Sequence, residues 1–217
     1  MDSYLAVIGD LIGSRQLPDR AALQENLKHS LHSLNTAYDS LIVSKFTLTL
    51  GDEFQALIRP DHRVMQLADE IEMKIGTPIR IGLGYGTMLT SIDREYSVGA
   101  DGEAYWNARH ALTHLKETKA KEHIRVKGFG AWQDDCLNAL LAASEVIKHR
   151  WTDLQHQTFH EMLRAGIYSD EFRQVDFAAA LGIEPSSLTK RLNAGAIKTY
   201  IRTRLAAGRT LEVFHDQ

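Results

Sequence analysis

The sequence has little cysteine, glycine or proline: of 217 residues, 1 is cysteine, 15 are glycine and 4 are proline. The single cysteine, Cys136, excludes an intramolecular disulfide framework and a cysteine-rich zinc site. So few glycines and prolines, beside 44% hydrophobic residues, exclude a collagen-like, low-complexity or wholly disordered chain. The remaining class is an ordinary folded protein of one to two domains with a buried core.

Long apolar runs are also missing. None approaches the roughly 20 residues of a membrane-spanning helix. The first residues lack a basic stretch, and Asp10 interrupts their apolar run, so they make a poor signal peptide. These features predict a cytoplasmic protein without a membrane partner. The Walker A, GxSxG and HExxH motifs are absent, as is a GxGxxG that opens a helix after the first strand.

Apolar periodicity predicts that strands and helices alternate over the first 150 residues. Strands are predicted at 4–9, 41–50, 54–58, 79–88 and 123–126, and helices at 21–38, 62–75, 102–115 and 131–150. This order favours an α+β, ferredoxin-like sandwich with helices on one face of a mostly antiparallel sheet. Further helices follow, so we expect a sheet domain at 1–150 and a small all-α domain at 151–217.

Glycine recurs at every second position of the strand predicted at 79–88. Gly82, Gly84 and Gly86 therefore share one face of that strand. Because this face carries no side chains, it suits the close approach of a helix or of a ligand.

Acidic residues stand where two strands meet a turn. Asp10 follows the first strand, and Asp52 and Glu53 lie at the tip of the predicted hairpin. If the elements are neighbours in the sheet, the carboxylates converge and, with phosphate oxygens and water, form a Mg²⁺ site. The alternative is structural: Asp10 caps a turn, and Asp52 is an ordinary hairpin aspartate.

The segment after the first strand is the candidate phosphate loop. A short glycine and serine turn directs backbone N–H groups toward phosphates, and an arginine adds positive charge. The candidate nucleotide-binding residues of this loop are Leu11, Ile12, Gly13, Ser14 and Arg15.

Four blocks resemble the SatD family: VIGDLIGSR (7–15), FTLTLGDEFQAL (46–57), IRIGLGYG (79–86) and VGADGEAYWNARHAL (98–112). The same blocks are more distantly similar to class III nucleotidyl cyclases and GGDEF-type palm domains. That resemblance implies a palm fold and two Mg²⁺ or Mn²⁺ ions held by Asp10 and Asp52, with Glu53 as the alternative ligand. It also implies that Gly84 lies near a bound nucleotide and that Asn107 and Arg109 are the candidate catalytic residues.

The helix predicted at 102–115 departs from the cyclase pattern. In cyclases an asparagine and an arginine four residues apart face the substrate together. Here Asn107 and Arg109 are two apart, which separates them by about 200° around a helix. If Arg109 takes the place of the cyclase arginine, Tyr105 stands at the asparagine position. We therefore expect nucleotide binding without rapid turnover.

The segment 174–193 has the pattern of a helix-turn-helix and resembles the DNA-reading helix pairs of bacterial regulators. Gly182 is expected to end its first helix, and Pro185 to begin the second. From Pro185 to Arg209 there are six basic residues and no acidic one. The predicted DNA contacts are Ser186, Ser187, Thr189, Lys190, Arg191 and Asn193. A helical packing module without nucleic acid is the alternative.

Together these patterns predict a bacterial regulator that binds a nucleotide with Mg²⁺ or Mn²⁺ and binds DNA as a homodimer. Two alternatives keep the same fold: an active cyclase or dinucleotide synthase, and an interaction adaptor with a vestigial palm site. The histidine pairs 110/114 and 156/160 lack a matching third metal ligand and are expected to be structural. Trp106, Trp132 and Trp151 are expected to be core or interface anchors.

Overall fold

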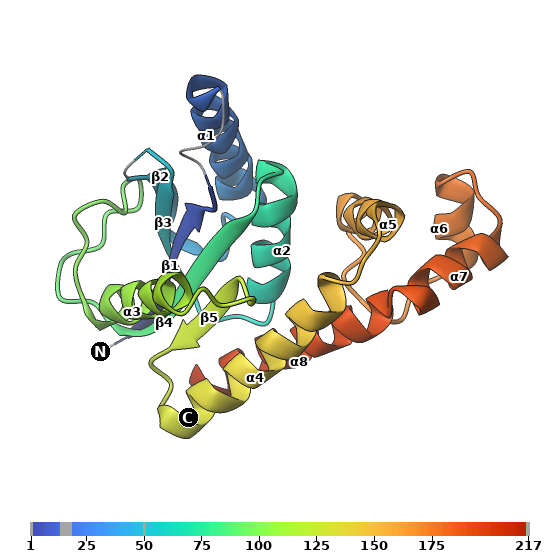
Figure 1. Ribbon diagram of the computed structural model, residues 1–217. Helices are drawn as coiled ribbons and strands as arrows, with labels where there is room; N and C mark the ends of the chain where they lie inside the picture. The colour runs from blue at the N-terminus through green and yellow to red at the C-terminus, as the bar shows by residue number, and fades with distance from the viewer. Residues whose placement is uncertain (1, 14–18, 50, 216–217) are drawn as a thin grey trace.

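The computed structural model describes residues 2–13, 19–49 and 51–215 (Figure 1). The elements are β1 (Ser3–Leu11), α1 (Arg20–Ala37), β2 (Ile42–Leu48), β3 (Glu53–Ile58), α2 (Val64–Ile75), β4 (Ile79–Thr87), α3 (Glu103–Glu117), β5 (Ile124–Lys127), α4 (Ala131–Lys148), α5 (Asp153–Arg164), α6 (Gln174–Ala180), α7 (Pro185–Ala194) and α8 (Ile197–His215). The order of strands and helices predicted from the sequence is confirmed.

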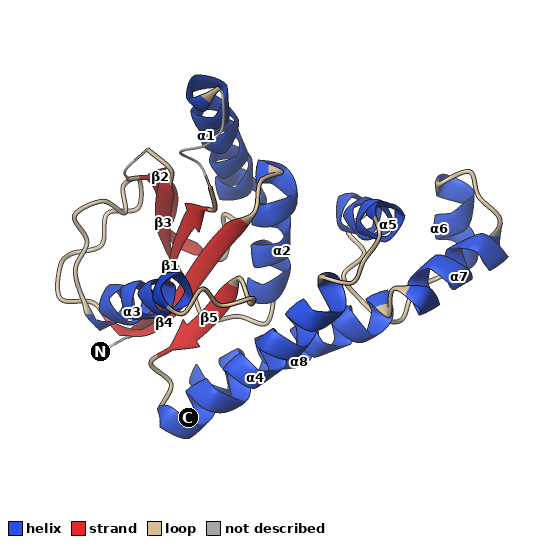
Figure 2. Ribbon diagram, viewed as in Figure 1, coloured by secondary structure: helices blue, strands red, loops and turns tan. Residues whose placement is uncertain are grey.

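The described strands form one sheet in the order β2-β3-β1-β4-β5 (Figure 2). The pairs β2–β3, β3–β1 and β1–β4 are antiparallel, whereas β4 and β5 are parallel. The first four strands, with α1 after β1 and α2 after β3, have the βαββαβ connectivity of a ferredoxin-like fold. The chain is therefore an α+β protein with a ferredoxin-like sheet extended by β5.

Alternate residues of β1 serve two cores, because successive side chains of a strand point to opposite faces. Leu5 and Val7 lie in the larger core with residues of α1 and α2. Ala6 and Ile8 pack with residues of α3 in a smaller core on the other face. The expectation of helices on one face only is therefore wrong. The β4–α3–β5 connection places α3 across the second face of the sheet (Figure 1). The apolar positions of α3 are buried there.

The glycines of β4 allow this close approach of α3. A Cβ atom built at Gly82 would lie 2.3 Å from the carbonyl oxygen of Ala108, and one at Gly84 would lie 2.0 Å from the backbone nitrogen of Ala108. Any side chain at either position would overlap the helix backbone. Of the two occupants expected for the glycine face, a helix and a ligand, the structure places the helix there.

Two long helices, α4 and α8, lie side by side and antiparallel, and they connect the sheet to a group formed by α5, α6 and α7 (Figure 1). The group has its own core, which includes Phe159, Phe177, Leu188 and Tyr200. Leu211, further along α8, belongs instead to the larger core under the sheet. Helix α8 therefore takes part in both cores, and the domain boundary near residue 150 stays a prediction.

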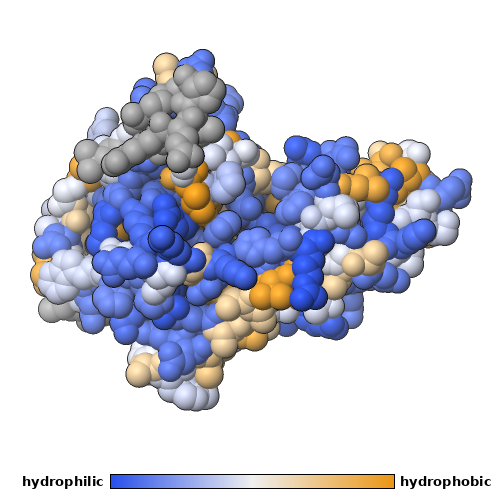
Figure 3. All heavy atoms as spheres, viewed as in Figure 1, coloured by the Kyte–Doolittle hydropathy of each residue, from blue (hydrophilic) through white to orange (hydrophobic). Residues whose placement is uncertain are grey.

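None of the described helices combines the length and hydropathy that crossing a bilayer requires. The face seen in Figure 3 is mostly hydrophilic around α3, and its hydrophobic side chains occur in small separate groups.

Candidate functional site

The register of the sheet sets Asp10 directly opposite Glu53 on the neighbouring strand β3. Asp10 follows Ala6 and Ile8 in the alternation of β1, so its side chain lies on the α3 face. Along β3, Glu53 lies four residues before Leu57, which packs with α3, so the side chain of Glu53 is on the same face. Two carboxylates therefore lie side by side at one end of the sheet, beneath α3.

Three cations surround this carboxylate pair. Arg80 of β4 donates two hydrogen bonds to Asp10, each 3.1 Å long. The Nζ atom of Lys116 lies 3.0 Å from the same carboxylate. Arg109 donates to both oxygens of Glu53, at 2.6 and 2.8 Å. We call these five residues, Asp10, Glu53, Arg80, Arg109 and Lys116, the carboxylate cluster. It carries one more positive than negative charge.

The bidentate contact between Arg109 and Glu53 shifts the pKa values of both groups. Burial by itself would raise the pKa of the Glu53 carboxyl, but the hydrogen bonds and charge of Arg109, together with Lys116 and Thr49, hold this pKa below its ordinary value of 4.5. The same hydrogen bonds raise the pKa of the Arg109 guanidinium. Glu53 is therefore ionised at neutral pH, as a metal ligand must be.

Asp52, the other acidic residue of the hairpin, lies in the turn before β3. Its carbonyl oxygen accepts a hydrogen bond from the backbone N–H of Leu11 at 3.2 Å. The cross-strand partner of Asp10 is therefore Glu53, whereas Asp52 is one residue removed along the hairpin.

The predicted phosphate loop begins with amides that are already engaged in backbone hydrogen bonds. Leu11 donates to Asp52, and Ile12 donates to Pro78 at 2.8 Å. Gly13 is exposed and has a positive φ of 72°. Ser14 and Arg15 lie outside the described residues. The backbone N–H groups of Leu11 and Ile12 are therefore not free to bind a phosphate.

The two candidate residues of α3 serve different strands, as their two-residue spacing predicts. Asn107 donates from its side-chain amide to the carbonyl of Tyr85 on β4, at 2.8 Å. Arg109 reaches Glu53 on β3. Tyr105, at the position of the cyclase asparagine, is buried against the sheet. Gly84 lies directly beneath the backbone of α3, so the helix covers it from a ligand on that face.

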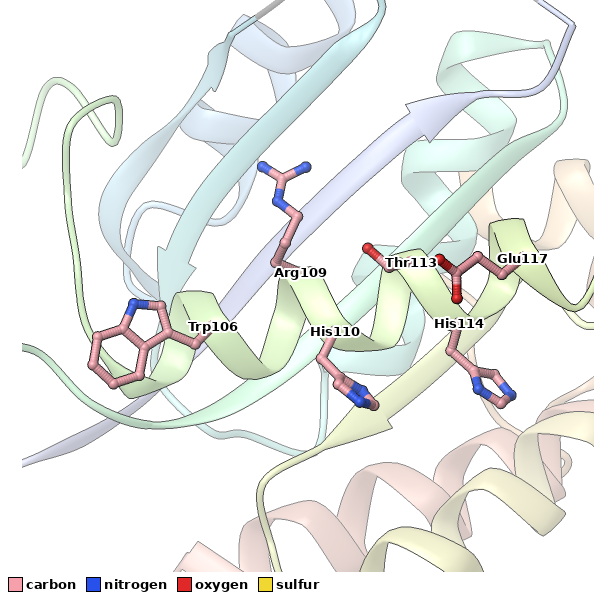
Figure 4. Close-up of a pocket in the computed structure, with 6 residues that line it drawn as sticks. All are labelled: Trp106, Arg109, His110, Thr113, His114 and Glu117. Carbon is pink, nitrogen blue, oxygen red and sulfur yellow. The ribbon is translucent and has the colours of Figure 1, made fainter.

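A groove of about 500 Å³ runs along α3 beside Arg109 (Figure 4). The side chain of Trp106 stands at one end of the labelled row, and that of Glu117 stands at the other (Figure 4). Trp106 is 55% exposed, and its indole N–H donates to Asp101 at 2.7 Å. The expectation of a buried anchor is thus wrong for Trp106, because its ring projects from α3 into solvent.

The other two tryptophans, Trp132 and Trp151, differ in the exposure of their side chains. Trp132 is 69% exposed, so the expectation of a buried anchor is wrong for it as well. Trp151 is buried, and its indole N–H donates to the carbonyl of Gly195 at 2.6 Å. Trp151 therefore anchors the second core, as predicted.

Sequence reasoning missed Arg80 and Lys116, although simple periodicities mark both. Arg80 precedes Gly82 by two residues in β4, so it shares the face that α3 covers. Lys116 follows Arg109 by seven residues, which brings it to nearly the same side of α3. The sequence alone does not show that the side of α3 with Arg109 and Lys116 faces β1, because this depends on how α3 crosses the sheet.

The candidate DNA-binding residues lie on α7, whose start at Pro185 is as predicted. Leu188 and Leu192 are buried, also as predicted. Gly182 follows α6 with a positive φ of 65°. The outward-facing set is Ser186, Ser187, Thr189, Lys190 and Asn193, which are exposed, and Arg191, which is half-buried.

Not all of the basic segment is available to a partner. Arg204 is 2% exposed and donates to Asp69 of α2 at 3.1 Å. Arg202 lies 3.9 Å from Asp170. Lys198 lies over the ring of Phe172. Of the six basic residues, Arg204 therefore serves the interior, while Lys190 remains exposed.

The fold and the carboxylate cluster define an α+β protein with a ferredoxin-like sheet and a charged site between β1, β3 and α3. The chain belongs to the SatD family, whose model matches residues 4–211. A search of curated proteins found no match.

Solved structures that align with the chain include a bacterial light-regulated adenylyl cyclase. It has 16% identity and a TM-score of 0.40, and the alignment covers 58% of this chain and 75% of that one. Another is the catalytic core of a rhodopsin-guanylyl cyclase with converted specificity, in complex with ATPαS. It has 19% identity and a TM-score of 0.36, with 52% and 72% of the two chains covered.

Proposed function

We propose that the carboxylate cluster binds the phosphates of a nucleotide together with Mg²⁺ or Mn²⁺. The observation that carries this proposal is the cross-strand pair Asp10–Glu53, enclosed by Arg80, Arg109 and Lys116. Two adjacent carboxylates supply the hard oxygen ligands that these ions prefer. The cations beside them match the phosphate oxygens that would complete the metal shell.

A bound metal ion would replace the internal partners of the carboxylates. The side chain of Arg109 is 46% exposed, and that of Lys116 is 38% exposed. Both cations are therefore open to solvent on one side, where a phosphate can reach them. Once the metal holds Asp10 and Glu53, these cations are free to contact phosphate. When bound, the metal would neutralise phosphate charge and fix the phosphate orientation.

The groove along α3 offers room for the rest of the nucleotide. Arg109 belongs both to this groove and to the carboxylate cluster, so the two are continuous. The exposed indole of Trp106 lies further along the groove and supplies a flat surface for stacking with a base. We place the phosphates at Arg109 and the base toward Trp106.

The contacts of α3 favour sensing over catalysis. Asn107 is engaged with the backbone of β4, and Tyr105 is buried, so neither accompanies Arg109 toward the site. A single arginine on the helix supports phosphate binding. It does not provide the paired groups that stabilise a leaving pyrophosphate in a cyclase. An active cyclase or dinucleotide synthase remains the alternative.

The test is nucleotide binding by the full chain with each of the four nucleoside triphosphates, in Mg²⁺ or Mn²⁺, followed by calorimetry and product analysis. We expect metal-dependent binding that falls at least about tenfold in Asp10→Asn and Glu53→Gln, because each removes a metal ligand. Asp39→Asn, which alters an exposed aspartate of another ion pair, should bind like the parent.

Other outcomes separate the alternatives. If Asp52→Asn abolishes binding and Glu53→Gln does not, the metal pair is Asp10 with Asp52. If the protein converts nucleoside triphosphate to a cyclic or linked nucleotide over multiple turnovers, it is an enzyme and the sensor interpretation is wrong. If no nucleotide binds in a metal-dependent way, the remaining interpretation is an interaction adaptor with a vestigial palm site.

A second candidate function is DNA binding by α7, which with the first makes the chain a nucleotide-responsive regulator. The observation that favours it is the row of short polar and basic side chains on the exposed face of α7, with Lys190 among them. Helix α8 starts directly after α7 and returns to the larger core, so it joins the two parts physically. A homodimer on a two-fold DNA site is the arrangement that such a helix pair requires.

A further inference from the structure

Two histidines and a glutamate meet where the end of α4 lies beside the start of β5. Glu145 lies in the last turn of α4, His149 directly follows that helix, and His123 directly precedes β5. The possible ligand atoms of these three side chains all lie within 4.8 Å of one another. Two imidazoles and one carboxylate are the donor set that zinc and similar divalent ions bind.

The donor atoms of this group are available. Among the described residues, no hydrogen bond engages the side chains of His123, Glu145 or His149, and the two imidazole rings meet edge to face at 5.3 Å.

In a second group of acidic and histidine side chains, the possible ligand atoms already have hydrogen-bond partners. Asp61, His62 and Glu212 also lie close together. There, however, Arg63 donates to both oxygens of Asp61, and His62 shares a hydrogen bond with Glu212 at 3.2 Å. The ligand atoms of that group already have partners, whereas those of His123, Glu145 and His149 have no hydrogen bond among the described residues, so the latter group is the stronger candidate.

Glu145 provides an independent indication of a missing cation. It is 4% exposed, and its nearest cation is Arg204, whose Nη1 lies 3.9 Å from the carboxylate, beyond hydrogen-bond distance. A largely buried carboxylate whose nearest cation lies this far away is stabilised by a closer one.

The charges around Glu145 lead to the same conclusion. Asp69, Glu72 and Glu145 carry negative charge, whereas Lys148 and Arg204 carry positive charge. One negative charge is in excess in this largely buried region. This excess favours binding of a cation beside Glu145.

We propose that His123, Glu145 and His149 bind one divalent ion of the Zn²⁺, Co²⁺ or Ni²⁺ class, with water in the remaining position. Ligand bonds of about 2.1 Å in a tetrahedral site place ligand atoms about 3.4 Å apart. The exposed side chain of His149 can rotate to close the remaining distance. The ion would fasten the end of α4 to the chain entering β5, beside Arg204 of α8.

The experiment titrates Zn²⁺, and separately Co²⁺, into full-length protein first treated with a chelator, using calorimetry and the visible absorption of Co²⁺. We expect one equivalent to bind and the thermal unfolding midpoint to rise. His149→Ala, at an exposed position, and Glu145→Gln should each weaken binding at least about tenfold. Circular dichroism of each variant without metal checks that it is folded.

The matched control is His156→Ala, which removes a histidine of another pair one turn apart, His156 and His160 on α5, without a carboxylate in the group. It should bind Zn²⁺ like the parent. The proposal is overturned if the parent binds no stoichiometric ion, if His149→Ala binds like the parent, or if His156→Ala loses binding as much as His149→Ala does.

Discussion

Glu53 illustrates how one residue of register decides a site. Side chains alternate along a strand, so a shift of one residue would move Glu53 to the opposite face and bring Asp52 under α3. The observed pairing sets Asp10 opposite Glu53, while Phe54 turns into the larger core. Burial of Phe54, which is 0% exposed, fixes this register. Burial of the apolar side chain of Phe54 thus determines that Glu53, and not Asp52, lies beside Asp10.

Gly84 allows a test of the contact between α3 and the sheet. Gly84→Ala should destabilise the protein by about 3 kcal/mol or more, because the added methyl meets helix backbone that cannot move locally. Urea unfolding measures the change. Gly76→Ala is the control, because a Cβ there meets nothing within 4 Å and only its positive φ of 68° opposes the substitution. We expect a loss of about 1–2 kcal/mol for it. Equal losses would show that α3 does not press on Gly84.

At the scale of elements, α7 has the start, buried stripe and exposed face that its sequence predicts. Pro185 begins the helix, and Leu188 and Leu192 hold it against the second core. Its N-terminal half presents serines and a threonine, whose hydroxyl groups suit hydrogen bonds to DNA. Only a binding experiment separates a DNA-reading helix from a packing helix with the same pattern.

That experiment is an anisotropy titration of duplex DNA at several salt concentrations. We expect the parent to bind with a steep salt dependence, and Lys190→Ala with Arg191→Ala to reduce the log–log slope by about 0.9 per lost phosphate contact. If Lys190 reads a base, its loss costs about 1–3 kcal/mol of sequence preference. Lys121→Ala, which removes an exposed lysine outside α7, should leave the slope unchanged. Absence of salt-dependent binding by the parent would make α7 a packing or partner-binding element.

At the scale of the whole molecule, Asp69 of α2 holds the sheet and the helical group together. Its buried carboxylate accepts hydrogen bonds from Tyr168 and Tyr200 of the second core, and from Lys148 and Arg204. These partners come from α4, α8 and the segment after α5. The contacts join parts of the chain that are distant in sequence, so the two cores are expected to unfold together.

Asp69→Asn tests this connection. The substitution leaves buried cations with less countercharge and should cost about 3–5 kcal/mol at pH 7. Asp170→Asn, in an ion pair with Arg202 whose side chain is 67% exposed, should change stability by less than about 0.5 kcal/mol. Urea unfolding of each variant measures both. A loss for Asp69→Asn no larger than that for Asp170→Asn would contradict the proposed role.

The pH dependence gives a second measurement on the same variant. Burial alone would raise the pKa of Asp69, but Arg204 and Lys148 outweigh it and hold the pKa below its ordinary value of 3.8. The stabilisation by this carboxylate is therefore present above pH 3.8 and is lost as pH falls below that value. The stability difference between the parent and Asp69→Asn should narrow on acidification below pH 3.8, as urea unfolding at pH 7 and pH 3 would show.

The sequence by itself determined the local elements. Periods of two and of three to four residues, with Pro185 and Gly182 at helix boundaries, fix strands and helices because these patterns follow from backbone geometry within one segment. The alternating glycines of β4 also indicated a close approach to that strand. The different directions of Asn107 and Arg109 followed from their spacing alone.

Only the tertiary structure decided which segments meet. The face that α3 covers, the selection of Glu53 beside Asp10, and the recruitment of Arg80 and Lys116 depend on sheet register and helix placement. The burial of Arg204 against Asp69, 135 residues away in sequence, likewise removed a cation from the basic segment. Such contacts depend on how apolar faces that are distant in sequence pack together. The charge and spacing of residues within one segment do not determine that packing.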